Sequence, residues 1–218
     1  MSGSDHTGLR VIAIDGPAGA GKSTVARALA ARLGLEYLDT GAMYRAVTFA
    51  AMRLGILDDD DAVTRLAHDV ALDVGEHGVI VDDVDATAAI RTPEVTAAVS
   101  RVAANSAVRA ELVRRQREWA QHRGGGVLEG RDIGSVVFPD AVLKLYLTAS
   151  PRVRAERRVA EAGGDVDEIE ASIARRDGLD SSRADSPLLE ADGAVVVDTT
   201  GLSIDAVLDH IAELLHTA

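Results

Sequence analysis

The stretch that decides the fold reads G-P-A-G-A-G-K-S-T and spans residues Gly16 to Thr24. It follows the apolar run Val11–Ile14 and precedes a run of helix-favouring residues that starts at Val25. Glycines allow backbone conformations closed to other residues, so successive N–H groups can turn inward around a polyphosphate at the N-terminus of the following helix. The order of strand, glycine-rich loop and helix therefore predicts a phosphate-binding loop.

Two side chains of this loop carry its chemistry. Lys22 would reach the β- and γ-phosphates of a nucleoside triphosphate, and Ser23 would ligate Mg²⁺. A glycine turn that merely joins a strand to a helix would need neither residue. We expect the whole loop to form the donor-nucleotide site, with contacts from Gly16, Pro17, Ala18, Gly19, Ala20, Gly21, Lys22, Ser23 and Thr24.

Length and composition are those of a single domain. With 218 residues, of which 47% are hydrophobic, the chain can bury one core and carry an inserted subdomain. We interpret residues 9–218 as that domain and residues 1–8 as a disordered N-terminus. No stretch approaches the ~20 apolar residues of a membrane span, and the first residues lack the basic and apolar regions of a signal peptide. We expect a cytoplasmic monomer, and the lack of cysteine excludes disulfides and thiolate metal sites.

The balance of charge argues against one class of partner. A formal net charge of −12 would repel a polyanion, so we expect no nucleic-acid binding. A phosphate site must then be built locally. Among the 23 basic residues only Lys22 and Lys144 are lysine, so a phosphate clamp beyond the loop must consist of arginines, which bind phosphate oxygens in a planar, bidentate manner. A coding bias towards arginine explains the surface positions equally well.

Short apolar, β-branched runs recur along the chain with helical segments between them. They are residues 11–15, 36–39, 126–129, 143–148 and 194–198. Five buried strands joined by helical crossovers predict an α/β fold, with a five-stranded parallel sheet covered by helices on both faces. Ligands bind beyond the carboxyl ends of such strands, where Gly16, Thr40, Arg131 and Ala149 fall.

Two stretches interrupt this alternation. Residues 70–92 contain two short β-like runs around a Gly-Glu-His-Gly turn, which predicts a β-hairpin within a small inserted subdomain. Residues 174–187 are charged and turn-rich and follow a predicted helix, a composition typical of a mobile covering loop. A solvated surface connection explains the second stretch equally well.

Polar residues follow two of the predicted strands at the ligand-binding edge. Thr40 can cap a helix, and Arg45, about one turn further on, can point back towards an anion; a cap with a surface arginine is the alternative. Glu129 ends the third strand, where it can hold Mg²⁺ through water. Arg131 and Asp132 follow directly, and their place at the edge favours substrate contacts over a simple ion pair.

The chain closely resembles the bacterial cytidylate kinase family over about residues 9–212. The matching segments, in order, are residues 16–24, Asp39–Arg45 (DTGAMYR), Ile90–Val95 (IRTPEV), Arg114–Arg117 (RRQR), Glu129–Ala141 and Arg175–Leu188. The most specific part is G-R-D-I-G-S-V-V-F-P-D-A, residues 130–141, because many unrelated enzymes share the phosphate loop. Ser23 stands where many members have glycine and Thr40 where serine is frequent, and both keep or add a hydroxyl.

The resemblance implies transfer of the γ-phosphoryl group of ATP to CMP or dCMP, with Mg²⁺, on a P-loop nucleoside-monophosphate-kinase fold. It also implies a nucleotide-binding insertion over about residues 41–115, which contains the hairpin, and a short lid over about residues 174–187. The residues implied to bind the acceptor nucleotide are Thr40, Arg45, Ser100, Arg109, Arg131, Asp132, Arg176, Asp180 and Arg183.

The resemblance also implies a role for each of these residues. Ser100, Arg109 and Asp132 are similar to the readers of cytosine, and Arg176 with Asp180 to the pair that faces the pentose. Arg45, Arg131 and Arg183 resemble the clamp on the acceptor phosphate and the transferred group. The implied catalytic residues are Lys22, Arg131, Arg176 and Arg183, and the segment that borders ATP contains Arg154, Arg157 and Arg158.

Particular residues of the chain argue against three rival families. The triplet Gly124–Gly126 resembles one in shikimate kinase, but the second strand lacks that family's aspartate pair. Adenylate kinase shares the Thr-Gly-x-x-x-Arg pattern of residues 40–45 but has neither the Gly-Arg-Asp segment of residues 130–132 nor the inserted hairpin. A regulatory GTPase would need an Asn-Lys-x-Asp segment to read guanine, and this chain contains none.

Overall fold

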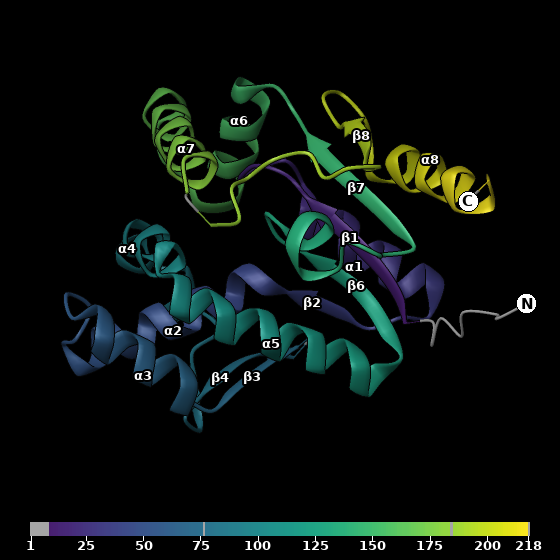
Figure 1. Ribbon diagram of the computed structural model, residues 1–218. Helices are drawn as coiled ribbons and strands as arrows, with labels where there is room; N and C mark the ends of the chain where they lie inside the picture. The colour runs from purple at the N-terminus through teal and green to yellow at the C-terminus, as the bar shows by residue number, and fades with distance from the viewer. Residues whose placement is uncertain (1–8, 76, 184, 218) are drawn as a thin grey trace, which may run out of the picture.

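The computed structural model describes residues 9–75, 77–183 and 185–217, which form two sheets and their covering helices (Figure 1). The large sheet comprises β1 (Arg10–Asp15), β2 (Tyr37–Asp39), β6 (Gly125–Glu129), β7 (Leu143–Thr148) and β8 (Val195–Asp198). The small sheet comprises β3 (Leu72–Gly75), β4 (Gly78–Val81) and β5 (Val84–Asp85). The α-helices are α1 (Lys22–Leu33), α2 (Thr40–Leu54), α3 (Asp60–Asp69), α4 (Pro93–Ala104), α5 (Ser106–Arg123), α6 (Pro151–Ala162), α7 (Val166–Ser181) and α8 (Ile204–Thr217).

The large sheet is parallel throughout, with the strand order β2-β6-β1-β7-β8. Its central strand β1 alternates between two cores. Val11 and Ala13 pack into the core that includes α2 and α5, whereas Ile12 and Ile14 pack into the core that includes α1 and α8. Because both faces are covered, β1 and β6 are buried along almost their whole length, whereas β7 alternates between buried and half-buried residues. The predicted five-stranded parallel sheet with helices on both faces is confirmed.

The strand register brings several carboxylates to one edge of the sheet. Ile14 of β1 and Asp39 of β2 both lie opposite Glu129 of β6. Asp15, the last residue of β1, lies opposite Tyr146 of β7. The segments that leave these strands therefore start beside one another, and a ligand at this edge can contact all of them.

The chain between β2 and β6 forms α2 to α5 and the small sheet, which Figure 1 shows grouped on one side of the large sheet. Within it β3 pairs antiparallel with β4, with Leu72 opposite Val81. This pairing confirms the predicted β-hairpin, and β5 extends it to three strands. The nucleotide-binding role of this insertion stays a prediction.

The expected covering loop differs from the structure in its first half. Residues 174–181 continue α7, which Asp165 caps by accepting from the N–H groups of Asp167 and Glu168. Gly178 lowers helix propensity by about 1 kcal/mol relative to alanine. The helix nevertheless continues, because Asp180 on its last turn bonds to Arg131 beyond β6.

Two other expectations concern the ends and surface of the chain. The N-terminus expected to be disordered, residues 1–8, lies outside the described residues. Across the described ranges, every helix is too short or too polar to cross a lipid bilayer.

Candidate active site

The phosphate loop joins β1 to α1 and curls around its own lysine. A Cβ on Gly16 would lie 2.0 Å from the carbonyl oxygen of Leu147, so the loop leaves the sheet in a space open only to glycine. Gly21 has a φ of +85° and directly precedes α1. Lys22 Nζ donates to the carbonyl of Pro17 at 2.8 Å, which keeps the ammonium over the loop. Burial and the charge of Arg131 lower the pKa of Lys22.

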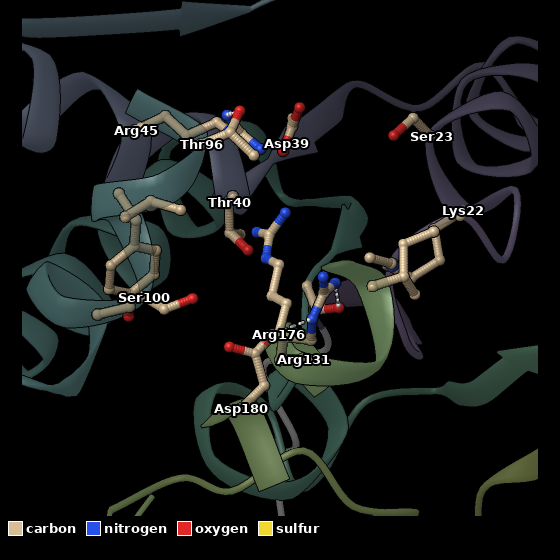
Figure 2. Close-up of a pocket in the computed structure, with 18 of the residues that line it drawn as sticks. Lys22, Ser23, Asp39, Thr40, Arg45, Thr96, Ser100, Arg131, Arg176 and Asp180 are labelled. Carbon is tan, nitrogen blue, oxygen red and sulfur yellow. Dashed lines mark hydrogen bonds and ion pairs between the residues drawn. The ribbon is translucent and has the colours of Figure 1, made fainter. Parts of the chain in front are cut away.

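A cavity of about 520 Å³ opens at the carboxyl edge of the large sheet (Figure 2). From the phosphate loop it is lined by Ala18, Gly19, Lys22 and Ser23, and from the end of β6 by Glu129. The predicted acceptor residues all line it as well: Thr40, Arg45, Ser100, Arg109, Arg131, Asp132, Arg176, Asp180 and Arg183. The fold thus brings together residues that are up to 165 positions apart, counting from Ala18 to Arg183.

The cavity concentrates positive charge in a chain that is acidic overall. In Figure 2 the side chains of Arg131 and Arg176 project into the space between Lys22 and Thr40. Burial, with the nearby charges of Arg131 and Arg45, lowers the pKa of Arg176 to about 9. Burial and the charge of Arg158 lower the pKa of Arg45 to about 10. Crowded cations of this kind favour an anionic ligand, which would relieve their repulsion.

Two of these guanidinium groups have donors without an acceptor. The Nε atoms of Arg176 and Arg183 are buried and have no hydrogen-bond partner among the described residues. Asp180, which is 1% exposed, accepts from Arg131 Nε at 2.9 Å and also pairs with Arg183. Asp180 therefore holds two arginines in place while leaving part of their hydrogen-bonding capacity for a ligand.

A second buried polar pair involves Arg109 of α5. Arg109 and Asp132 form a buried ion pair, with side chains 5% and 7% exposed. Arg109 also donates to the Ala103 carbonyl at 3.1 Å and lies 5.4 Å from the centre of the Tyr44 ring. Its Nε has no partner among the described residues, so this pair still offers a donor to a ligand beside Tyr44 and Ser100.

Oxygen donors gather where a metal ion would meet the phosphates. Glu129 is buried and accepts from the Tyr37 hydroxyl, and burial together with the charge of Asp39 raises its pKa. Ser23 and Asp39 line the same cavity as Glu129. The described residues contain no cluster of three or more histidine, cysteine or carboxylate side chains that could hold a metal alone.

The three arginines of α6 that were expected to border ATP have different partners, and their contact with ATP stays a prediction. Arg158 lines the cavity. Arg157 instead donates to the hydroxyl and carbonyl of Thr199 at 2.9 and 2.8 Å. Arg154 donates to the carbonyls of Ala149 and Ala18 and also pairs with Asp177.

Several cavity residues were not assigned a role from the sequence. Arg91 pairs with Asp39 at 3.4 Å, and the Thr96 hydroxyl accepts from Arg45 Nη1 at 2.8 Å. Tyr37, which orients Glu129, was also missed. The available signals were weak: Arg91 lies in a matching segment, but a tyrosine inside a strand reads as an ordinary core residue.

Comparison with known proteins agrees with this geometry. A family model described as cytidylate kinase matches residues 12–217. The bifunctional pantoate ligase/cytidylate kinase of Trichormus variabilis is 48% identical over 227 residues, which cover 96% of this chain and 42% of that protein. The protein of the same name from Synechococcus elongatus is 52% identical over 219 residues, with 94% and 41% covered.

A solved structure supports the fold. The crystal structure of an uncharacterized protein from Eubacterium ventriosum matches with a TM-score of 0.58 at 12% identity, covering 96% of this chain and 99% of that one.

The chain spans less than half the length of the curated relatives it matches. The family match, however, runs from β1 to α8 and includes the phosphate loop, the insertion and α7. The chain therefore belongs to the cytidylate kinase family, as its motifs predicted.

Proposed function

We propose that this domain transfers the γ-phosphoryl group of ATP to CMP or dCMP, giving ADP and CDP or dCDP. The observation that carries the proposal is one cavity lined both by a phosphate loop and by the buried Arg109–Asp132 pair. The loop offers a site for a triphosphate, and the pair offers a donor and an acceptor for a pyrimidine base. Membership of the family supports ATP as the donor.

The chain's own residues supply positioning and positive charge. Phosphoryl transfer passes through a loose transition state whose charge lies on the peripheral oxygens, so the reaction needs alignment and cations more than a covalent nucleophile. Lys22 would contact the transferring group from the donor side, and Arg131, Arg176 and Arg183 from the acceptor side. The unpartnered Nε atoms of Arg176 and Arg183 support this role.

The residues near the loop fit Mg²⁺, which prefers oxygen ligands and keeps several waters and substrate phosphates in its shell. The Ser23 hydroxyl and the Glu129 and Asp39 carboxylates line the cavity and offer such oxygens. We propose that Ser23 holds the ion directly and Glu129 through water. The ion would neutralise charge on the phosphate oxygens.

Recognition of the base follows from the donor and acceptor pattern of cytosine. Its exocyclic amine is a donor beside a ring-nitrogen acceptor, so Asp132 would accept from the amine while Arg109 donates. Uracil carries a carbonyl in place of the amine and would face the Asp132 carboxylate with no proton between them. Such a buried unsatisfied group costs about 1–3 kcal/mol. We therefore expect CMP to be preferred over UMP.

Location and partners complete the proposal. We propose that the domain acts in the cytoplasm, as a monomer and on small-molecule nucleotides. The net charge of −12 supports the absence of nucleic acid from its substrates. The local cluster of arginines explains how an acidic protein still attracts nucleotides.

A coupled assay tests the substrate assignment. ATP is combined with CMP, dCMP, UMP, AMP or shikimate, and kcat/KM is compared for the wild type and Asp132→Asn. We expect a preference for CMP over UMP of at least about 10-fold, and a reduction of that ratio by about 10-fold in the variant, because an amide can present a donor or an acceptor.

The CMP/UMP ratio of kcat/KM is the useful readout. Breaking the Arg109–Asp132 pair lowers the stability of the protein, and this loss affects the activity with both substrates equally. Asp140→Asn makes the same chemical change at an exposed position and should leave the ratio unchanged. A wild type that prefers UMP, AMP or shikimate would contradict the proposed substrate. A ratio unaffected by Asp132→Asn would show that cytosine is read elsewhere.

A further inference from the structure

Helix α7 carries a carboxylate that reaches the phosphate loop. Asp177 Oδ1 accepts from the N–H of Ala18 at 3.3 Å, and its Oδ2 accepts from Arg154 Nη1. The same Arg154 nitrogen donates to the Ala18 carbonyl at 3.0 Å. Both backbone polar groups of Ala18 are therefore held, the N–H by α7 and the carbonyl by α6.

This contact is built to hold the loop in position. The Arg154 and Asp177 side chains are only 9% and 17% exposed, and Arg154 Nε donates to the Ala149 carbonyl. A Cβ on Gly19 would lie 2.9 Å from the Arg154 carbonyl oxygen, so α6 lies directly against the loop. Because the two charges neutralise each other, the Asp177 carboxylate does not cancel the positive field that attracts phosphate.

The same turn of α7 also faces the acceptor side. Arg176 and Asp180 line the cavity, and Asp180 is bonded to Arg131. Adjacent helix positions point about 100° apart, so Arg176 and Asp177 project towards different neighbours. A displacement of this turn would therefore change the contacts of α7 with both the phosphate loop and the acceptor pocket.

We propose that Asp177 is a positioning residue that couples the two sites through α7. A nucleotide on the phosphate loop orders Ala18, Ala18 holds Asp177, and α7 then presents Arg176 and Asp180 to the acceptor. The coupling is reciprocal, so an acceptor in the pocket also favours nucleotide binding. The identity of the two ligands rests on the proposed function, whereas the link from loop to helix does not.

Hydrogen exchange with ADP–Mg²⁺ alone tests the link without any acceptor. In the wild type we expect ADP–Mg²⁺ to slow exchange both in the phosphate loop and in residues 174–182. In Asp177→Ala the loop should remain protected while the protection of residues 174–182 is lost. Glu168→Gln, an exposed change on the first turn of the same helix, is the matched control and should behave as the wild type.

Binding of ADP–Mg²⁺ with and without saturating CMP measures the coupling itself. We expect the wild type to bind ADP–Mg²⁺ about 5-fold or more tightly with CMP present, within the usual range of coupling between sites. The factor should fall towards 1 in Asp177→Ala. Asp177→Asn, which keeps an oxygen for Ala18 but loses the ion pair with Arg154, should give an intermediate factor.

The outcomes separate this inference from the proposed function. Failure of the wild type to phosphorylate CMP would contradict the proposed function, and the exchange experiment would still decide the link. Retention of ADP-dependent protection of residues 174–182 in Asp177→Ala would overturn the inference. A lowered Tm with loss of protection in loop and helix together would also overturn it, because that result indicates general destabilisation.

Discussion

The donor and acceptor sides of the cavity are built in opposite ways. The proposed donor side is one continuous loop, residues 16–24, whose shape depends on glycines and which would bind phosphate through backbone N–H groups and Lys22. The acceptor side collects side chains from α2, α4, α5, α7 and the segment after β6. A backbone site is specified locally, whereas a side-chain site exists only when the whole fold is in place.

The difference also appears in how charge is handled. The loop confines a single lysine close to the Pro17 carbonyl. The acceptor side crowds several arginines together and tethers two of them, Arg131 and Arg183, to the buried Asp180. We expect loss of the lysine to remove an irreplaceable contact, and loss of one arginine to be partly compensated by its neighbours.

Replacement of Lys22 by alanine should have the largest effect. The change removes the charge nearest the transferring phosphate from the donor side, and we expect kcat to fall by about 10³-fold with the fold intact. Steady-state kinetics and circular dichroism measure the two properties. Lys144→Ala, the other lysine of the chain, should keep kcat because Lys144 Nζ donates to the carbonyls of Pro139 and Asp192, away from the cavity lining. Near-normal turnover in folded Lys22→Ala would contradict the donor-site assignment.

Replacement of Arg131 by alanine tests the acceptor side. We expect kcat to fall by about 10²-fold, less than for Lys22, because Arg176 and Arg183 remain near the transferred group. Arg114→Ala is the control, since Arg114 is exposed and pairs with Glu111 and Glu118 of its own helix. If Arg131→Ala raised KM for the acceptor and left kcat unchanged, Arg131 would bind the ground state and the catalytic role would be wrong.

The same contrast explains how much could be predicted. Strand β7 matches its predicted range of residues 143–148, because buried leucines recur at every second position, a pattern that local sequence reveals. The phosphate loop could also be predicted from the local sequence. The end of α7 was misread as a loop, since Asp180 looks like a solvated charge until the fold places Arg131 beside it. Composition alone does not reveal such partners.

The site shows the same limit at single residues. That Arg154 borders ATP stays a prediction, but its contacts with the Ala18 carbonyl and Asp177 could not be predicted. A long side chain has several rotamers, and distant neighbours select among them. Asp132 and Arg109 were assigned from family resemblance, and the cavity brings them into contact across 23 positions of sequence.

Asp15 joins the two sides, and its titration should affect stability rather than turnover. Its carboxylate precedes the phosphate loop and accepts from the N–H groups of Ile133 and Gly134, directly after Asp132. Burial raises the pKa of Asp15 from 3.8 to about 6. The folded protein therefore favours the protonated carboxyl. The contribution of Asp15 to the free energy of unfolding is complete below pH 4, and it is lost as the pH rises to 6, by on the order of 3 kcal/mol.

Urea unfolding at pH 4 and pH 7 should show this extra loss of stability in the wild type and not in Asp15→Asn, while the other carboxylates titrate alike in both proteins. Equal pH dependence in the two proteins would contradict this prediction. It would mean that the pKa of Asp15 is the same in the folded and the unfolded protein, because the two backbone donors offset its burial completely.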